Sequence, residues 1–201
     1  MSKTIDLITP FGPQLGRVDL DSNIVSYLNS HLDDTLADYS HKLVGKVSQE
    51  LLFSKEITEF MLEELKPYLV TYHNNSVLEK GRDLEITVHG GWYVRQYANE
   101  YNPLHIHTHC TISVVGYLSL PQDIEDEWEN EYKSRLPTNG FLEFAYGSAA
   151  MPYCLGSKRV RPKVGELYIF PSGLWHVVYP FFSPGERRSF SMNFSIFSKN
   201  T

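Results

Sequence analysis

The sequence predicts a mainly β protein, an antiparallel sandwich or barrel with helices packed on one outer face of a sheet. From about Leu84 onward, short runs rich in valine, isoleucine, tyrosine and phenylalanine alternate with glycine, proline and asparagine, as strands joined by turns do. No helical period separates most of these runs, which argues against a parallel α/β sheet. The chain of 201 residues suits a single domain, with a helical part at about 20–80 and a β core at about 85–197.

Two helices are expected in the first part of the chain. One, capped by Asp21 or Ser22, carries apolar residues near a period of 3.6 as far as Tyr39. Ser54 opens the second, which Pro67 is expected to kink or end. Both apolar stripes are most simply core, so these helices should cover one face of a sheet.

The expected strands are rich in β-branched and aromatic residues and are bounded by turn residues. They are Glu85–His89, Trp92–Tyr97, His105–Leu120, Phe141–Tyr146, Glu166–Phe170, His176–Pro180 and Arg188–Phe197. One irregular insert, Gln122–Asn139, interrupts the series. We expect it to form either a fixed helix over a sheet edge or a partly mobile cover near a pocket mouth.

Composition excludes several classes of protein. The formal net charge of −6 disfavours general nucleic-acid binding, which needs the opposite sign. Only two cysteines occur, too few for a disulfide framework, so a reducing compartment is expected. The chain has no signal-peptide pattern and no run of about 18 apolar residues. We therefore expect a cytoplasmic protein without a membrane partner.

The histidines carry the first chemical signal. His105, His107 and His109 alternate with single residues, and alternate side chains of a strand share one face, so two neighbours can converge on one ion. His176 follows a Pro-Ser-Gly corner, where a pocket mouth would lie, and is the expected third ligand. Imidazole suits iron, zinc, copper and nickel. The alternative is a polar strand face without a metal.

A second signal follows His176. Arg187, Ser189, Ser191 and Asn193 are spaced to share one strand face. A guanidinium and a hydroxyl two residues apart can hold one carboxylate, and an unpaired arginine inside a sheet would be costly. An anionic ligand is therefore expected. The alternative is a surface arginine that pairs with Glu186 or with solvent.

The order of these motifs resembles that of the iron(II)- and 2-oxoglutarate-dependent oxygenases: His-x-His, a distal His, then Arg-x-Ser. The run from Tyr97 through Tyr101 and Pro103 to His105 and His107 looks like the approach to the metal strand in prolyl-4-hydroxylase-like members. The chain is most similar to the small, mostly uncharacterised oxygenases of bacteria and phages, over roughly residues 85–197. The resemblance implies a double-stranded β-helix, the jelly-roll fold shared with cupins.

The resemblance also implies a role for particular residues. His105, His107 and His176 would bind Fe(II), Arg187 would grip the distal carboxylate of 2-oxoglutarate, Ser189 would donate beside it, and Tyr97 or Tyr101 would add a hydrogen bond. Most of the superfamily has Asp or Glu at the position of His107, and this departure leaves the bound iron with one more positive charge. His109 is an alternative partner if the strand bulges.

The expected function is therefore that of an Fe(II)- and 2-oxoglutarate-dependent oxygenase. With dioxygen it would hydroxylate an unidentified substrate and release succinate and carbon dioxide, in the host cytoplasm if a phage encodes it. One alternative is a three-histidine, cupin-like dioxygenase that does not use 2-oxoglutarate. Another is a catalytically silent β-barrel that acts as a binding or structural module. A homodimer is left open.

Overall fold

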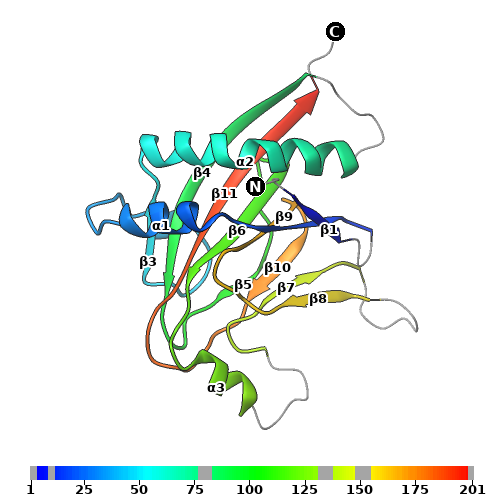
Figure 1. Cartoon of the computed structure of the whole chain (residues 1–201). Helices are drawn as coiled ribbons and strands as arrows, with labels where there is room; N and C mark the ends of the chain where they lie inside the picture. Colours follow the sequence, from blue (N-terminus) through cyan, green and yellow to red (C-terminus); the bar gives the residue numbers. More distant parts are fainter. Residues whose placement is uncertain (1–3, 9–11, 77–82, 131–137, 148–154, 199–201) are drawn as a thin grey trace.

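The computed structural model describes residues 4–8, 12–76, 83–130, 138–147 and 155–198. It consists of two antiparallel sheets that face each other, with helices on one side (Figure 1). The large sheet has seven strands in the order β1-β2-β9-β6-β11-β4-β3, and the small sheet has four in the order β5-β10-β7-β8. The predicted mainly β, antiparallel architecture is confirmed.

The elements have the following bounds. The large sheet contains β1 (Asp6–Ile8), β2 (Leu15–Asp19), β3 (Gln49–Leu52), β4 (Leu84–Gln96), β6 (Ile112–Ser119), β9 (Glu166–Pro171) and β11 (Arg187–Ser198). The small sheet contains β5 (Asn102–His105), β7 (Leu142–Ala145), β8 (Ser157–Val160) and β10 (Trp175–Val178). The helices are α1 (Ser22–Ser30), α2 (Lys55–Ser76), α3 (Ile124–Glu129) and a short 3-10 helix, η1 (Ser40–Lys42).

Both predicted helices begin where their capping residues indicate. The Asp21 carboxylate accepts from the backbone N–H of Asn23 at 2.9 Å, and the Ser54 hydroxyl accepts from that of Ile57 at 3.2 Å. α1 and α2 cross the same face of the large sheet (Figure 1) and bury their apolar stripes against it. Burial of this apolar interface stabilises the fold.

The ends of these helices differ from the expectation. α1 stops at Ser30 rather than near Tyr39, because the Asp33 carboxylate accepts from the backbone N–H of Thr35 at 2.7 Å and forms a turn. α2 does not end at Pro67 but continues to Ser76. Its buried face, which includes Tyr72, holds the last turns in place.

The two faces of β11 lie in different surroundings, one in the apolar core and the other in a cavity. Phe190, Met192 and Phe194 belong to the core beneath the helices and are fully buried. The alternate residues Arg187, Ser189, Ser191 and Asn193 line a cavity on the opposite face. The predicted common strand face for these four residues is thus confirmed.

The predicted strand His105–Leu120 is wrong as a single element. β5 ends at His105 and β6 begins only at Ile112. Between them His109 has a φ of 64°, in the left-handed region, which strands do not use. His107 therefore lies on a connection and not on a strand.

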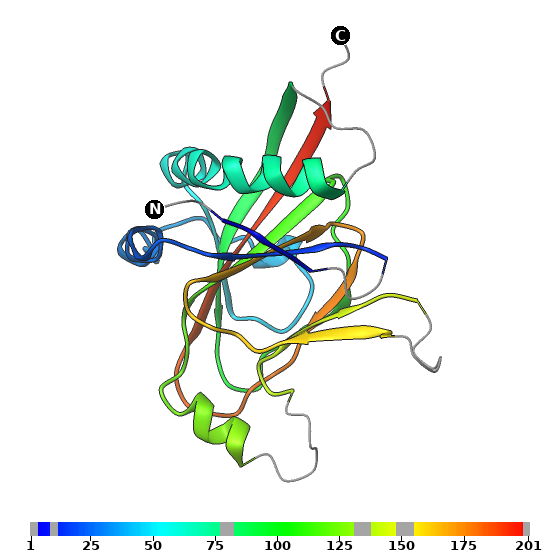
Figure 2. The same cartoon turned by 45° about the vertical axis from the view of Figure 1, so that its right-hand side comes forward.

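Two short strands, β3 and β8, are absent from the elements expected from the sequence. The connection from α1 to β3, drawn in light blue, lies between the two sheets (Figure 2). Two isolated bridges tie it down, Asp38 with Leu51 and Lys46 with Tyr101. This connection therefore forms part of the structure around the cavity.

The insert Gln122–Asn139 is described except at residues 131–137, which lie outside the described part. Its helix, α3, buries Ile124 and Trp128 against Phe141 and Phe181, and the Trp128 ring N–H donates to the carbonyl of Asn139 at 2.7 Å. None of its described residues lines the cavity. The described part thus matches the edge-covering helix better than the mobile cover.

The search for membrane-spanning helices, made over the described residues, found none long and apolar enough to cross a membrane.

Two adjacent glycines of β4 provide a test of this packing. A Cβ on Gly91 would lie 2.6 Å from Phe53 and 2.8 Å from Met192, whereas one on Gly90 would meet nothing within 4 Å. Because over-packing a core strains its neighbours, we expect Gly91→Ala to lower the free energy of unfolding by about 1–3 kcal/mol. Denaturant unfolding measures the effect. Gly90→Ala is the control, and equal losses in both variants would contradict the packing described.

Candidate metal centre

A cavity of about 460 Å³ lies between the sheets, within the usual size range for small-molecule sites. Its walls come from β4, β6 and β11 of the large sheet, β10 of the small sheet, the connection after β5, and the connection from α1 to β3. The apolar cluster that contains Tyr117, Phe144 and Phe170 packs between the sheets beside it. The cavity is thus held by both layers of the fold.

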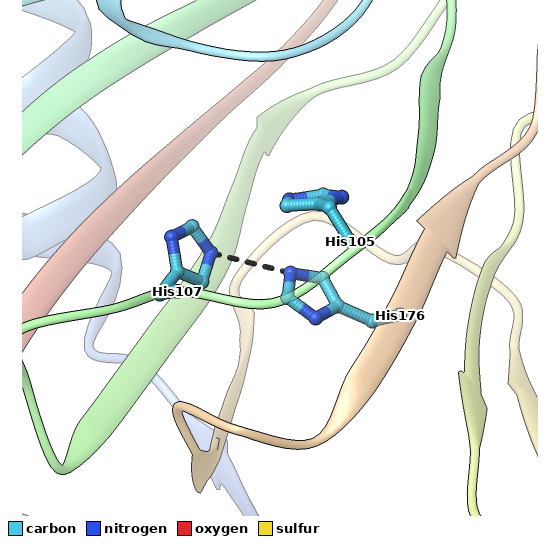
Figure 3. A group of neighbouring side chains, drawn as sticks. All are labelled: His105, His107 and His176. Atoms are coloured by element: carbon cyan, nitrogen blue, oxygen red, sulfur yellow. Dashed lines mark hydrogen bonds between the residues drawn. The ribbon is translucent and has the colours of Figure 1, made fainter.

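His105, His107 and His176 meet at one end of this cavity (Figure 3). His105 ends β5, His107 lies on the connection that follows, and His176 lies on β10. One ligand atom from each ring lies within 4.8 Å of the others. Nε2 of His107 and Nε2 of His176 are 3.2 Å apart.

Backbone carbonyls orient two of the three rings. Nδ1–H of His105 donates to the carbonyl of Pro103 at 2.6 Å, and Nδ1–H of His176 donates to that of Leu174 at 2.9 Å. A carbonyl can only accept, so in the neutral rings the proton lies on Nδ1 and the Nε2 lone pair is free. This is the usual outer hydrogen bond of a metal-binding histidine.

The three rings fit a divalent transition metal. Two nitrogens bound at right angles to one ion, each about 2.1 Å from it, lie about 3 Å apart, close to the distance between His107 and His176. Burial lowers the pKa of His105. Burial and the neighbouring imidazoles together lower the pKa of His107 to about 4 and that of His176 to about 3. Neutral imidazole is the form that binds a metal.

Arg187 lies in the same cavity and is only 3% exposed. Its Nη1 donates to the carbonyl of Gly140 at 2.8 Å, but its Nε has no partner. Glu186 pairs instead with Arg95 and Arg188. Among the described arginines, Arg187 alone has no carboxylate partner, as an arginine that binds an anionic ligand requires.

Two polar residues accompany Arg187 in the wall of the cavity. Ser189 is 2% exposed and lies on the same strand face. The ring of Tyr117 lies 5.9 Å from the guanidinium carbon, and burial raises the pKa of Tyr117 to about 12. Its hydroxyl therefore stays protonated and can donate to an anion at neutral pH.

The structure does not bring every expected residue to this site. Tyr97 and Tyr101 do not line the cavity; they flank a turn in which the Tyr97 backbone N–H donates to Glu100 at 2.9 Å, and the Tyr101 side chain is exposed. His109 lines the cavity but is exposed and is not a member of the histidine cluster. His107 and His109 were the two alternatives for the second ligand. The structure brings His107, and not His109, close to His105 and His176.

The sequence analysis missed one wall of the cavity. Glu50 and the segment from Tyr39 to Val44 form it. Glu50 lies on β3 opposite Val94 and is 4% exposed. A carboxylate that opens an apolar run, Glu50-Leu51-Leu52-Phe53, was the available signal, but only the pairing of β3 with β4 reveals where it lies.

The fold and site together define a class: jelly-roll proteins with a cluster of histidines that could hold a metal ion and a buried arginine in one cavity. A family model described as "Putative 2OG-Fe(II) oxygenase" matches residues 90–193, about half of the chain. The chain belongs to this family, whose cofactor is iron(II) and whose co-substrate is 2-oxoglutarate. The match includes all three histidines, Arg187 and Ser189. A search of curated proteins gave no match.

Solved structures agree on the fold. A Pseudomonas putida prolyl-4-hydroxylase is 15% identical with a TM-score of 0.57, over 96% of this chain and 93% of the other. A collagen prolyl hydroxylase of Paramecium bursaria Chlorella virus-1 is 13% identical with a TM-score of 0.54, over 90% and 94%. HygX of Streptomyces hygroscopicus, solved with nickel and 2-oxoglutarate, is 10% identical with a TM-score of 0.56, over 90% and 82%. The fold is the double-stranded β-helix of these oxygenases.

Glu50 allows a test that needs no ligand. Burial raises its pKa from 4.5 to about 7, so between these values the folded protein binds more protons than the unfolded chain, and stability is lost as pH rises through this window. We expect Glu50→Gln to stabilise the metal-free protein at pH 8 by about 1–3 kcal/mol and to have little effect at pH 4 to 5. Unfolding of both proteins across pH measures the difference. An equal effect at both ends would contradict a buried, unpaired carboxyl.

Proposed function

We propose that this protein is an Fe(II)- and 2-oxoglutarate-dependent hydroxylase. The observation that carries the proposal is the presence, in one cavity, of three converging imidazoles and a buried arginine without a carboxylate partner. The first group provides neutral metal ligands, and the second provides a counter-charge for a dicarboxylate. Family membership supports the same assignment.

His105, His107 and His176 hold the iron in this proposal. Iron, when bound, supplies the activation of dioxygen that couples oxidative decarboxylation of 2-oxoglutarate to hydroxylation of a C–H bond, with release of succinate and carbon dioxide. The residues of the chain orient the imidazole ligands and exclude water. The carbonyls of Pro103 and Leu174 keep two rings turned toward the cavity, and the apolar cluster between the sheets keeps bulk water from that end.

Arg187 binds the distal carboxylate of 2-oxoglutarate. The carbonyl of Gly140 holds one nitrogen of its guanidinium, which leaves the remaining donors for the co-substrate. The hydroxyls of Ser189 and Tyr117, which line the same cavity, donate beside it in this proposal. Because the cavity wall is buried, each charge-assisted hydrogen bond is stronger here than in water.

The three-histidine, cupin-like dioxygenase is the second candidate, and the ligand set alone would suit it equally well. It has no fixed need for a buried arginine on the cavity wall, so Arg187 favours the 2-oxoglutarate reading. A catalytically silent β-barrel would need neither the histidine cluster nor the buried Arg187. Burying these polar groups without a function would lower the stability of the fold.

The structural neighbours act on different substrates. Two are prolyl hydroxylases, and HygX has been solved with hygromycin B. At 10–15% identity none of these substrates transfers to this chain. The substrate must be inferred from the cavity itself.

The ligand set is tested by metal binding. We expect His176→Ala to weaken Fe(II) or Ni(II) binding by at least tenfold, because the ring is buried and its Nε2 faces the cluster. Anaerobic titration with metal analysis gives the affinities. His41→Ala, on the connection from α1 to β3, is the control and should bind metal as the unmodified protein does. Unchanged retention by the His176 variant would remove this ligand from the assignment.

The co-substrate site is tested at Arg187. We expect Arg187→Ala to weaken 2-oxoglutarate binding to the Ni(II)-loaded protein by roughly tenfold to over a hundredfold, since a charge-assisted hydrogen bond is lost. Arg187→Lys should lose less, because lysine keeps the charge but not the planar fork. Calorimetric titration measures both.

Arg188 is the matched control for this experiment. It lies on the opposite face of β11, where it binds Glu186 and Asn29, so Arg188→Ala should leave 2-oxoglutarate affinity nearly unchanged. If neither arginine affected 2-oxoglutarate while Ni(II) still bound, the cupin-like reading would replace the one proposed.

A further inference from the structure

Four glutamates are buried in the part of the chain that the structure describes. Three of them are satisfied by donors of the protein: Glu100 by the backbone N–H groups of Ser48 and Tyr97, Glu143 by Arg159 and Tyr179, and Glu166 by Arg17 and Tyr168. The fourth, Glu50, forms no ion pair with any described residue. It faces the cavity.

The surroundings of Glu50 offer it little compensation. Its one hydrogen-bond partner is the amide side chain of Asn102, while burial and the carboxylates of Asp38 and Glu100 raise its pKa to about 7. A buried carboxyl of this kind destabilises the fold unless a donor or cation reaches it. Because Glu50 lines the cavity, a ligand bound there can supply this donor or cation.

Glu50 is separate from the region assigned to 2-oxoglutarate. On the inner face of the large sheet it is paired with Val94 of β4, and Val94 is paired with Ser189 of β11. Strands lie about 4.8 Å apart, so the backbones at Glu50 and Ser189 are about 10 Å apart. No ion pair joins Glu50 to Arg187. The cavity therefore presents an unpaired cation and an unpaired anion at different places.

The wall near Glu50 is also aromatic. The rings of Tyr39 and Trp92 lie 5.6 Å apart and both line the cavity. Aromatic faces beside a carboxylate attract an ammonium or guanidinium group. Lys42, an exposed residue, already lies over the Tyr39 ring at 5.6 Å, at the solvent side of this wall.

We infer that this wall is the primary-substrate subsite and that it takes a positively charged group, a protonated amine or a guanidinium, which pairs with Glu50 beside the rings of Tyr39 and Trp92. The inference rests on the proposed function, which assigns the other end of the cavity to iron and 2-oxoglutarate. It names the substrate class that the oxygenase would hydroxylate: an amine- or guanidine-bearing compound, held by its cation.

The test uses Ni(II)- and 2-oxoglutarate-loaded protein and matched probes. Butylamine and N-acetyl-lysine methylamide are compared with their neutral N-acetylated counterparts, and butylguanidine with the neutral butylurea, by ligand-observed NMR at millimolar concentration. We expect at least one cationic probe to bind more tightly than its neutral counterpart, and Glu50→Gln to weaken that probe about tenfold or more. Lys42→Met, which removes a like charge from the rim, should strengthen it.

Two outcomes would overturn the inference: equal binding of the cationic probes and their neutral counterparts, or unchanged binding of the cationic probes in Glu50→Gln. Ni(II) and 2-oxoglutarate titrations on the same samples keep it distinct from the proposed function. If those titrations succeed and the probes show no preference for a cation, only the subsite is wrong. If they fail while a cation still binds through Glu50, only the cofactor assignment is wrong.

A second, independent observation concerns the ring of His107. Its Nε2 faces His176, and its Nδ1 lies 3.4 Å from the side-chain nitrogen of Asn193, whose oxygen accepts from the Ser113 hydroxyl at 2.7 Å. A metal-binding Nε2 requires the proton on Nδ1, which then needs an acceptor. Turning the Asn193 amide by 180° supplies its oxygen to Nδ1–H and its N–H to Ser113, and both orientations fit the same space because the amide oxygen and nitrogen are nearly equal in size.

The geometry points to Asn193 as the positioning residue of His107, doing with a side chain what backbone carbonyls do for the other two ligands. An aspartate ligand at this position would instead need a donor for its second oxygen. We expect Asn193→Ala to weaken Ni(II) binding about 10–100-fold. Asn193→Asp, which offers an acceptor, should restore it.

Ser191→Ala, one inward-facing position away on β11, is the control and should bind Ni(II) normally. The visible spectrum of the Co(II)-loaded protein provides a second readout, since a ring that loses its anchor changes the ligand field, whereas a general loss of stability does not. Unchanged affinity and spectrum in Asn193→Ala would overturn the assignment, as would a failure of Asn193→Asp to restore either.

Discussion

The pairing of β10 with β5 is the constraint on which the rest of the site depends. It sets His176 directly opposite His105, and side chains opposite each other in an antiparallel pair are about 5 Å apart at Cβ. Their ring centroids are 4.2 Å apart. One further backbone hydrogen bond, from His107 N–H to the carbonyl of Ser172 at 2.9 Å, ties the connection after β5 to the turn before β10. Main-chain contacts therefore position all three histidines: a strand pair of the small sheet for His105 and His176, and a contact with the turn before β10 for His107.

The large sheet has a different role, because it supports groups that are costly to bury. Arg187 and Glu50 lie on its inner face without charged partners, and the cavity holds three neutral histidines. Its outer face is covered by α1 and α2 over one continuous apolar core. Strain and unpaired charge persist in proteins where the surrounding structure over-determines them. The two faces of β11, apolar outside and polar inside, separate stability from function along a single strand.

Much of this could be predicted from the sequence, because local patterns determine it. The alternation of polar and apolar residues in β11 predicts which of its side chains share a face. The capping residues Asp21 and Ser54 predict where α1 and α2 begin. Contacts between distant segments decided the rest. The predicted strand from His105 breaks at the left-handed His109, yet His107 still reaches the cluster through Ser172. Tyr97 and Tyr101 fit the motif in sequence, but the turn around Glu100 turns them away from the cavity. The apolar run after Glu50 indicated only a strand; the pairing of Glu50 with Val94 of β4 is what places it in the cavity wall.

The histidine at the second ligand position changes the charge of the whole site. A divalent ion held by three neutral imidazoles, with Arg187 nearby, leaves the cavity with a net charge of about +3 before Glu50 is counted, whereas an aspartate at this position would leave about +2. Neutral ligands attract the metal ion less strongly than an aspartate would, while the more positive metal site attracts a dianionic co-substrate more strongly. Affinities linked in this way are reciprocal, so 2-oxoglutarate tightens the metal as much as the metal tightens 2-oxoglutarate. The outer hydrogen bonds to the three rings gain importance for the same reason, because no ligand charge compensates for a ring that is poorly oriented.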